Sequence, residues 1–333
     1  MPRHARLDAP GTLHHVIGRG LEGVLVFPAT EEREDFLQRL GKLSEAGAWR
    51  VYAWALMGNH FHLLVQTCEQ SLSWCMRRLL TGYVVNFNRR HHRFGHLFQN
   101  RYKSILCQDE PYLLELTRYI HLNPVRAGIV KSLRGLRTYP WTGHATLVGR
   151  NGRTWQDTDT ILARFGRRTR DAIRRYEEFV GEGVSLGRRP ELTGGGLIRS
   201  QGGWSEVISL RRKGQVAASD ARILGESDFV EQVLANAEAR VKETLGWRGR
   251  APTLPAMLEA VAGRTGVEAA RIRSGNRQRD VAHARRILCQ LAVNRCGYSG
   301  AAVARFLGAT TSLVNRLAYT AEVPALEKYL RRE

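Results

Sequence analysis

The chain has 333 residues, of which 43% are hydrophobic, enough for two or three domains with cores of their own. It contains no run of about 18 apolar residues, so no transmembrane helix is expected. The five cysteines are odd in number and form no CxxC pair, which argues against a disulfide framework or a zinc ribbon.

The formal net charge of +20 favours a polyanionic partner. Residues 1–150 hold 20 Lys and Arg against 11 Asp and Glu, so the positive excess is spread over the chain and not confined to a tail. A spread of this kind suits a long nucleic acid that touches several parts of the molecule. A compositional preference for Arg is the alternative explanation. A membrane surface is the weaker candidate, because no helix pattern gathers its basic residues on one side.

The first part of the chain predicts alternating strands and helices. Residues 12–18 indicate a strand and residues 31–46 a helix. Two strand-like runs, 49–57 and 60–66, are separated by Gly58-Asn59, which is typical of a tight hairpin turn. A helix, a strand and a helix follow, over 71–90, 97–107 and 110–122. Strands joined by a hairpin, with helices between them, predict an α+β fold in which helices pack on an antiparallel sheet.

The rest of the chain predicts two further regions. Residues 151–225 are basic and include the Gly-rich stretch 181–203, so we expect a linker or extension there. Residues 226–333 predict an all-helical domain. Its expected helices are 227–245, 254–263, 267–272, 278–296, 299–307 and 310–319.

The last two of these helices form a candidate helix-turn-helix. Gly308 separates them, and the second contains small polar and basic residues. Asn315 and Arg316 are therefore candidate DNA contacts. The alternative is an ordinary pair of antiparallel helices within a bundle.

His60 and His62 lie two residues apart on a predicted strand. Side chains alternate along a strand, so both imidazoles lie on one face and Phe61 faces the opposite side, in the core. Two neutral imidazoles can form half of a metal site. A purely structural pair of histidines is the alternative at this point.

The helix 110–122 offers a second group of candidates. Tyr119 and Asn123 are four residues apart, so they share one helix face. An Asn amide oxygen is a hard ligand, and two nitrogens with one oxygen suit Mg²⁺ or Mn²⁺ while leaving positions for phosphate oxygens. Beside such a metal, Tyr119 can attack a phosphodiester and form a 5′-phosphotyrosine. A tyrosine that only packs on the sheet is the alternative.

Three segments resemble one family when taken together. Residues 57–65 (MGNHFHLLV) resemble the HUH motif, in which a bulky apolar residue separates two histidines. Residues 97–104 (LFQNRYKS) resemble the FQxRYKS block, and residues 118–128 (RYIHLNPVRAG) the RYIHLNPVRAG block. The blocks stand in the order found in REP-associated tyrosine transposases, which are relatives of insertion-sequence transposases, and they span roughly residues 10–145.

The resemblance implies a ferredoxin-like catalytic domain over residues 1–150. It implies that His60, His62 and Asn123 hold the metal and that Tyr119 is the nucleophile. The implied substrates are single-stranded DNA hairpins with REP-like palindromes, cleaved and rejoined without ATP. We accordingly expect a cytoplasmic, nucleoid-associated bacterial protein. We expect a monomer, with a dimer that exchanges the tyrosine helix as the alternative.

The turn after the first strand departs from the family pattern. It keeps Arg19 and Gly20, but Leu21 stands at the usual Asn position and Glu22 is acidic. The DNA sequence recognised is therefore the least transferable property. The candidate DNA contacts near the motifs, each of which has a solvated surface charge as its alternative, are Arg19, Arg101, Lys103, Arg118 and Arg126.

Two other functions compete with the strand transferase. One is a DNA-binding regulator with an inactive N-terminal domain. The other is a metal-dependent hydrolase in which the histidine pair activates water and Tyr119 only positions the substrate.

Overall fold

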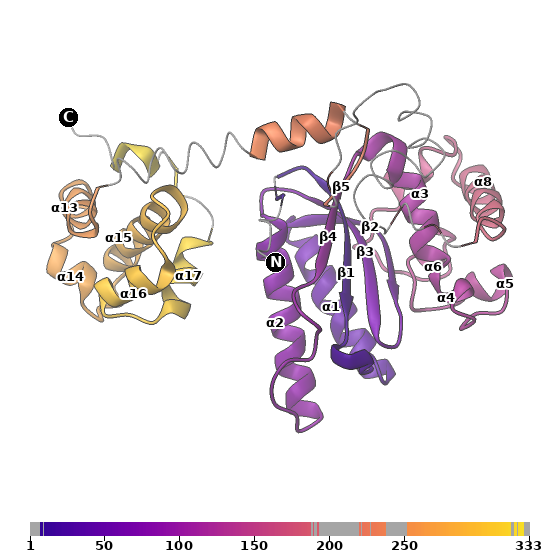
Figure 1. Ribbon diagram of the computed structural model, residues 1–333, viewed down its shortest axis with the longest axis horizontal. Helices are drawn as coiled ribbons and strands as arrows, with labels where there is room; N and C mark the ends of the chain where they lie inside the picture. Colours follow the sequence, from indigo (N-terminus) through magenta and orange to yellow (C-terminus); the bar gives the residue numbers. More distant parts are fainter. Residues whose placement is uncertain are drawn as a thin grey trace. The chain divides into compact units, whose positions relative to one another are not determined.

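The chain forms two compact units in the computed structural model, Met1–Val233 and Leu234–Glu333. The structure describes residues 7–187 except 9, and then 189, 192, 220, 222–226, 228–237, 252–320, 323, 324 and 326–329. Among these residues, no helix is long and apolar enough to cross a membrane. Each unit is described by itself below, with the elements labelled as in Figure 1.

The first unit is built on a five-stranded sheet in the order β2-β3-β1-β4-β5. The first four strands pair antiparallel, and the two-residue strand β5 runs parallel to β4. The predicted α+β fold is confirmed, and the order of the first four strands is the ferredoxin-like one. The strands are β1 (Leu13–Arg19), β2 (Trp49–Leu56), β3 (His60–Thr67), β4 (Lys103–Cys107) and β5 (Ile223–Leu224).

Helices cover both faces of this sheet (Figure 1). Helices α1 (Thr30–Glu45) and α2 (Leu72–Arg90) bury Val16, Phe61 and Leu63 on one face. Helix α3 (Asp109–His121) packs on the other face, against Leu64 and Ile105. Because the side chains of β1 and β3 alternate between the two cores, apolar residues of each strand reach both faces, with polar residues between them.

The fourth strand is shorter than the predicted 97–107. Asn100 has a φ of 58°, a left-handed conformation that interrupts extended backbone. The residues before it pair with the end of β1, since Leu97 accepts a hydrogen bond from the Leu21 amide and Gln99 donates one to the Arg19 carbonyl. The prediction was right about extended chain and wrong about one continuous strand.

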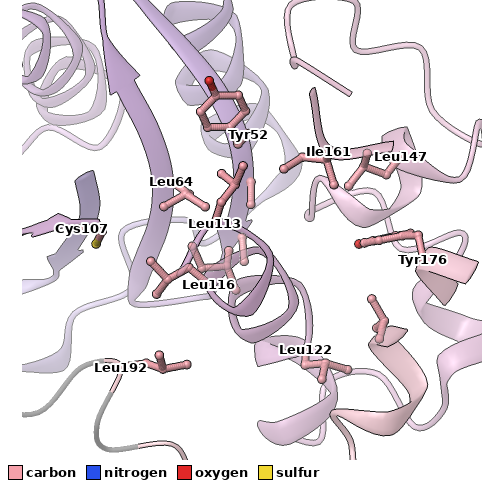
Figure 2. Close-up of a cluster of buried hydrophobic side chains, with 14 of the residues drawn as sticks. Tyr52, Leu64, Cys107, Leu113, Leu116, Leu122, Leu147, Ile161, Tyr176 and Leu192 are labelled. Carbon is pink, nitrogen blue, oxygen red and sulfur yellow. The ribbon is translucent and has the colours of Figure 1, made fainter. Parts of the chain in front are cut away.

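Part of the region expected to be a linker is folded. Helices α7 (Asp159–Leu162) and α8 (Thr169–Glu182) bury Ile161, Ala172, Tyr176 and Val180 in the same core as α3 (Figure 2). The last three stand four residues apart, so they form one apolar stripe along α8. The first unit therefore extends past the expected boundary at residue 150. Residues 193–219 of the expected linker lie outside the described residues.

Three short helices lie between α3 and α7 in the chain: α4 (Asn123–Arg126), α5 (Leu133–Leu136) and α6 (His144–Leu147). A 3-10 turn, η1 (Leu21–Gly23), follows β1.

The second unit is helical around a core of its own. Gly308, with a φ of 60°, ends α16 and allows the turn into α17. The predicted helix 278–296 ends at Gln290 and continues as a π-helical turn, η2 (Leu291–Arg295). Residues 228–237 are helical, and 238–245 of that predicted helix lie outside the described residues. The remaining elements are α13 (Leu254–Thr265), α14 (Ala269–Arg273), α15 (Arg279–Gln290), α16 (Gly300–Leu307), α17 (Thr311–Ala318) and η3 (Leu326–Tyr329).

Candidate active site

Three histidines face α3 from adjacent strands of the sheet. In the antiparallel register His62 lies opposite Ile17 and His60 opposite Arg19, so His60, His62 and His15 share one face. The ring centroids of His60 and His62 are 5.3 Å apart, as are those of His62 and His15. Phe61 is fully buried on the opposite face, as its intermediate position predicts.

Each histidine of the predicted pair is oriented through its Nδ1 atom. His62 Nδ1 lies 3.0 Å from His15 Nε2, and His60 Nδ1 lies 2.7 Å from Asn59 Oδ1. Metal-binding histidines are commonly held in this way, because a hydrogen bond at one ring nitrogen fixes the lone pair of the other. The Nε2 atoms of His60 and His62 are thus the candidate ligand atoms.

Burial keeps both imidazoles neutral. It lowers the pKa of His62 well below its usual range, and the neighbouring His15 and His60 add to this effect. Burial also lowers the pKa of His60, with a smaller contribution from the guanidinium of Arg19. A metal ligand must be the neutral ring, so these surroundings suit ligation.

Tyr119 approaches the histidines from the last turn of α3. Its ring centroid lies 6.0 Å from that of His62 and 6.0 Å from that of His15, edge-on to both. Asn123 begins α4, one turn further on, and its Nδ2 donates to the Ile120 carbonyl at 3.3 Å. The sequence prediction placed the histidine pair on a single face, and the structure brings Tyr119 to that face.

The two neutral imidazoles suit a divalent metal whose other coordination positions stay open. Within the described residues, no group of three or more His, Cys, Asp and Glu side chains could hold a metal ion. The remaining ligands would therefore have to come from an amide such as that of Asn123, from water or from the substrate.

Arg126 contacts Tyr119 directly. Its guanidinium carbon lies 5.2 Å from the centroid of the Tyr119 ring. Its two terminal nitrogens donate to the carbonyls of Tyr119, at 3.4 Å, and of Gly183, at 3.2 Å. The residue expected to be a DNA contact is thus built into the support of the tyrosine.

Arg118 does not have the position expected of a DNA contact. It is only 7% exposed, forms an ion pair with Glu115 at 2.7 Å and donates to the Phe179 carbonyl at 3.2 Å. Its guanidinium also lies 4.1 Å from the centroid of the Phe179 ring. A helix residue next to Tyr119 points away from the site, because consecutive helix positions are rotated by about 100°. The expectation of a phosphate contact at Arg118 is corrected.

The other cations expected near the motifs are exposed. Arg19, Arg101 and Lys103 all reach solvent. Arg19 lies directly opposite His60, and Lys103 lies opposite Ile17 on the other side of β1. This edge of the site is therefore positively charged and open to an anionic ligand.

Comparison with known proteins places these residues in a family. Residues 26–123 match the family model described as Transposase IS200 like. This segment is similar to IS200-like transposases. The matched range includes His60, His62, Tyr119 and Asn123, and it confirms the suspected relationship to tyrosine transposases.

No curated protein matches the chain. A solved structure of a REP-associated tyrosine transposase bound to a REP hairpin is similar, with 17% sequence identity and a TM-score of 0.38, over 50% of this chain and 98% of that one.

A buried polar cluster behind α3 links it to α6 and α8. The Tyr176 hydroxyl of α8 lies 2.7 Å from His121 Nδ1 of α3 and 3.1 Å from His144 Nδ1 of α6. Burial lowers the pKa of His121 well below its usual range and that of His144 to about 4, so both rings are neutral. The phenol can then donate to one ring and accept from the other.

The end of α8 also packs tightly on α3. A Cβ at Gly183 would lie 2.5 Å from Arg118 Cδ and 2.9 Å from Leu122 Cδ1. Arg118 and Arg126 both donate to carbonyls of this segment. Helix α8 therefore fixes the part of α3 that carries Tyr119. Sequence reasoning missed this support, and the stripe of Ala172, Tyr176 and Val180 was the one signal for it.

Tyr176→Phe is expected to destabilise the first unit by about 2 kcal/mol. The change keeps the ring but leaves two buried imidazole nitrogens without the hydroxyl, and an unmade buried hydrogen bond costs about 1–3 kcal/mol. Denaturant unfolding of the full chain, followed by circular dichroism, measures it. Tyr139→Phe is the matched control, because Tyr139 is only half-buried and is expected to change the unfolding free energy much less. Equal stability of the Tyr176→Phe and wild-type proteins would contradict a structural role for the cluster.

In the second unit, the two predicted contact residues differ in placement. Arg316 is exposed on α17. Asn315 is half-buried and lies against α16, where a Cβ at Gly300 would come within 2.2 Å of Asn315 Oδ1. The geometry thus presents Arg316 to a ligand and places Asn315 at the packing of the two helices.

Proposed function

We propose that this protein cleaves and rejoins single-stranded DNA through a covalent 5′-phosphotyrosine at Tyr119. The match of residues 26–123 to the family model of IS200-like transposases supports a DNA strand-transfer role. The motif blocks resemble those of REP-associated tyrosine transposases, which supports DNA hairpins formed by REP-like repeats as the substrate class. Such a substrate would place the protein at the bacterial nucleoid.

One observation carries the proposal above the alternatives. The Tyr119 ring lies 6.0 Å from the His62 ring, on the sheet face that His60 also shares. A regulator with a catalytically inactive domain would not require a tyrosine beside the histidine pair. A hydrolase would need the histidines but not a tyrosine held by Arg126 from a second element.

The reaction is a transesterification. The Tyr119 hydroxyl gives its proton to solvent and its oxygen forms a bond to phosphorus. The bond from phosphorus to the 3′-oxygen breaks, and the 3′-oxygen takes up a proton from solvent. A bound Mg²⁺ or Mn²⁺ would polarise the scissile phosphate and stabilise the leaving oxygen. Rejoining reverses the step with a 3′-hydroxyl as nucleophile, so no ATP is required.

The residues around Tyr119 prepare it for attack. The Arg126 guanidinium over the ring favours the negative charge that develops on the phenol oxygen. Arg19, opposite His60, is placed to hold a phosphate at the edge of the site. One chain carries the histidine pair and the tyrosine on the same face, which supports a monomer as the active form.

A trapping experiment tests the proposal. The full chain is incubated with a 5′-labelled and, separately, a 3′-labelled hairpin oligonucleotide with single-stranded flanks and Mn²⁺, and the products are separated on a denaturing gel. We expect a protein–DNA adduct with the 3′-labelled strand alone, since the tyrosine retains the 5′-phosphate. Cleavage without an adduct would favour the hydrolase, and binding without cleavage in Mn²⁺ or Mg²⁺ would favour the regulator.

Replacement of Arg126 by Ala is expected to slow adduct formation about tenfold while DNA affinity changes less. The change removes the cation over the Tyr119 ring, a contact worth about 1 kcal/mol or more when partly desolvated. Single-turnover kinetics at saturating DNA separate the chemical step from binding. Arg126→Lys restores the charge without the two-carbonyl contact and should recover part of the rate. A loss of affinity with an unchanged single-turnover rate would instead assign Arg126 to DNA binding.

The second unit supports a DNA-binding role through α16, the Gly308 turn and α17. We infer that α17 contacts double-stranded DNA, with the exposed Arg316 as a contact residue. Arg316→Ala should weaken duplex binding and leave formation of the Tyr119 adduct on a single-stranded substrate unchanged.

A further inference from the structure

The segment 88–99, which is the last turn of α2 and the loop after it, carries an aromatic side chain almost wholly in water. Phe94 is 96% exposed, the largest exposure among the large hydrophobic residues that the described part of the chain leaves on its surface. Leaving a phenyl ring fully hydrated forgoes about 2 kcal/mol of burial. The feature therefore calls for a ligand that covers the ring.

The loop holds Phe94 in this position through bonds of its own. Asn88 Nδ2 donates to the Gly95 carbonyl at 3.0 Å, and the Arg93 amide donates to the Asn88 carbonyl at 2.8 Å. His92 adopts a φ of 50° and Gly95 a φ of 87°, so the chain turns sharply on both sides of Phe94. The Phe94 ring is therefore held by a hydrogen-bonded turn and not by an extended segment.

The loop lies in a basic stretch of the first unit. No acidic residue occurs between Glu69 and Asp109. Arg89 and Arg101, which precede and follow Phe94 in the sequence, are both exposed, whereas Arg90 forms an ion pair with Glu32 at 2.8 Å. The cations of the stretch are Arg77, Arg78, Arg89, Arg90, Arg93, Arg101 and Lys103.

The loop continues directly into the edge of the candidate active site. Its last residues pair with the end of β1, through bonds of 2.9 Å from the Leu21 amide to the Leu97 carbonyl and 2.8 Å from the Gln99 amide to the Arg19 carbonyl. Arg19 lies opposite His60. Gln99 is the fifth residue after Phe94, so the Cα atoms of the two residues are at most about 17 Å apart. Figure 1 shows the end of α2 and the turn η1 at the same end of the sheet.

We propose that Phe94 stacks on an unpaired base of single-stranded DNA whose neighbouring phosphates contact Arg89 and Arg101. The inference rests on the proposed function for its substrate class and adds a binding position outside the catalytic residues. An exposed aromatic ring beside cations is the combination by which proteins hold single strands without reading a sequence. The distance along the loop allows the same strand to reach Arg19 and Tyr119.

Affinity measurements with two ligands test the stacking. The first ligand is a fluorescein-labelled single-stranded oligonucleotide, and the second is a strand of the same length that has the sugar–phosphate backbone but no bases. Stacking on an aromatic residue contributes about 1–3 kcal/mol per base, so Phe94→Leu should weaken binding of the first ligand about tenfold. It should leave binding of the second unchanged. Phe94→Trp should restore the affinity for the first.

Three controls make the outcome decisive. Val85→Ala removes another exposed apolar side chain, 61% exposed on α2, and should alter neither affinity. Arg89→Gln should weaken both ligands, because phosphates are common to both. Thermal unfolding of Phe94→Leu should match that of the wild type, since the ring makes no core contact.

Equal binding of the first ligand by wild type and Phe94→Leu would overturn the inference, as would an equal loss with both ligands. A change in sedimentation with unchanged DNA affinity would assign Phe94 to self-association and would also overturn it. These results are independent of adduct formation. A tenfold, base-dependent effect in a protein that forms no adduct would uphold the stacking and reject the tyrosine mechanism, and the reverse pattern would reject the stacking alone.

Discussion

Tyr119→Phe is expected to abolish covalent adduct formation and to lower strand cleavage by at least about 10⁴-fold. Removal of a catalytic nucleophile alone has effects of this size or larger, because the covalent route has no substitute. The change deletes one oxygen and keeps the ring that lies edge-on to His15 and His62. The helix, the Arg126 contact and the affinity for DNA should therefore persist, and they are checked by unfolding and by fluorescence anisotropy.

Tyr112→Phe provides the matched control for this experiment. Tyr112 lies two turns earlier on α3, is half-buried and packs against the core behind the sheet. Its phenylalanine variant should form the adduct at the wild-type rate. Cleavage that survives Tyr119→Phe would reject the tyrosine as nucleophile and would leave the hydrolase, in which the histidines activate water.

The histidine pair could be predicted because its determinants are local. A Gly-Asn turn fixes where the hairpin reverses, and the alternation of side chains then decides which residues face α3. Residues 60–62 contain all that is needed to place His60 and His62 on one face and Phe61 on the other. The same holds for the spacing of Tyr119 and Asn123 along the chain.

The support of the tyrosine could not be predicted in the same way. Arg118, Tyr119 and Arg126 belong to one sequence motif. From the sequence alone, both arginines are candidate DNA contacts. The partners that decide their roles, Phe179 and Gly183, lie more than 55 residues away. Pairings at that separation depend on how α8 docks, which local periodicity does not encode. The Gly-rich stretch 181–203 instead leads the sequence analysis to predict a linker or extension over residues 151–225.

Together, these contacts explain how α3 packs in the core and also presents Tyr119 to the histidines. Ile120 and Leu116 bury one side of α3 against the sheet, while Arg118 and His121 bond to α8 and its neighbours. Only the stripe that carries Tyr119 is left to face the histidines. Contacts on two sides of α3 therefore fix the position of Tyr119 beside the histidines.

His60→Ala and His62→Ala are each expected to lower metal-dependent cleavage at least about 100-fold. Loss of a residue that only orients a ligand typically costs 10–100-fold in metal affinity or activity, and loss of the ligand itself should cost more. DNA affinity should change little, since phosphate contacts carry most of it. Mn²⁺ titrations of adduct formation measure the effect, and added chelator should abolish the wild-type activity.

The variant His60→Ala tests the metal site more directly than His62→Ala does. It is half-buried, whereas His62 is 6% exposed and bonded to His15, so His62→Ala also removes a buried hydrogen bond and requires an unfolding measurement beside it. Asn59→Ala extends the series, because Asn59 Oδ1 lies 2.7 Å from His60 Nδ1 and should shift the Mn²⁺ requirement by a smaller factor than His60→Ala. His283→Ala, an exposed histidine of the second unit, should have no effect. An unchanged Mn²⁺ requirement in His60→Ala would remove His60 from the metal site, and full cleavage in the presence of chelator would remove the metal from the reaction.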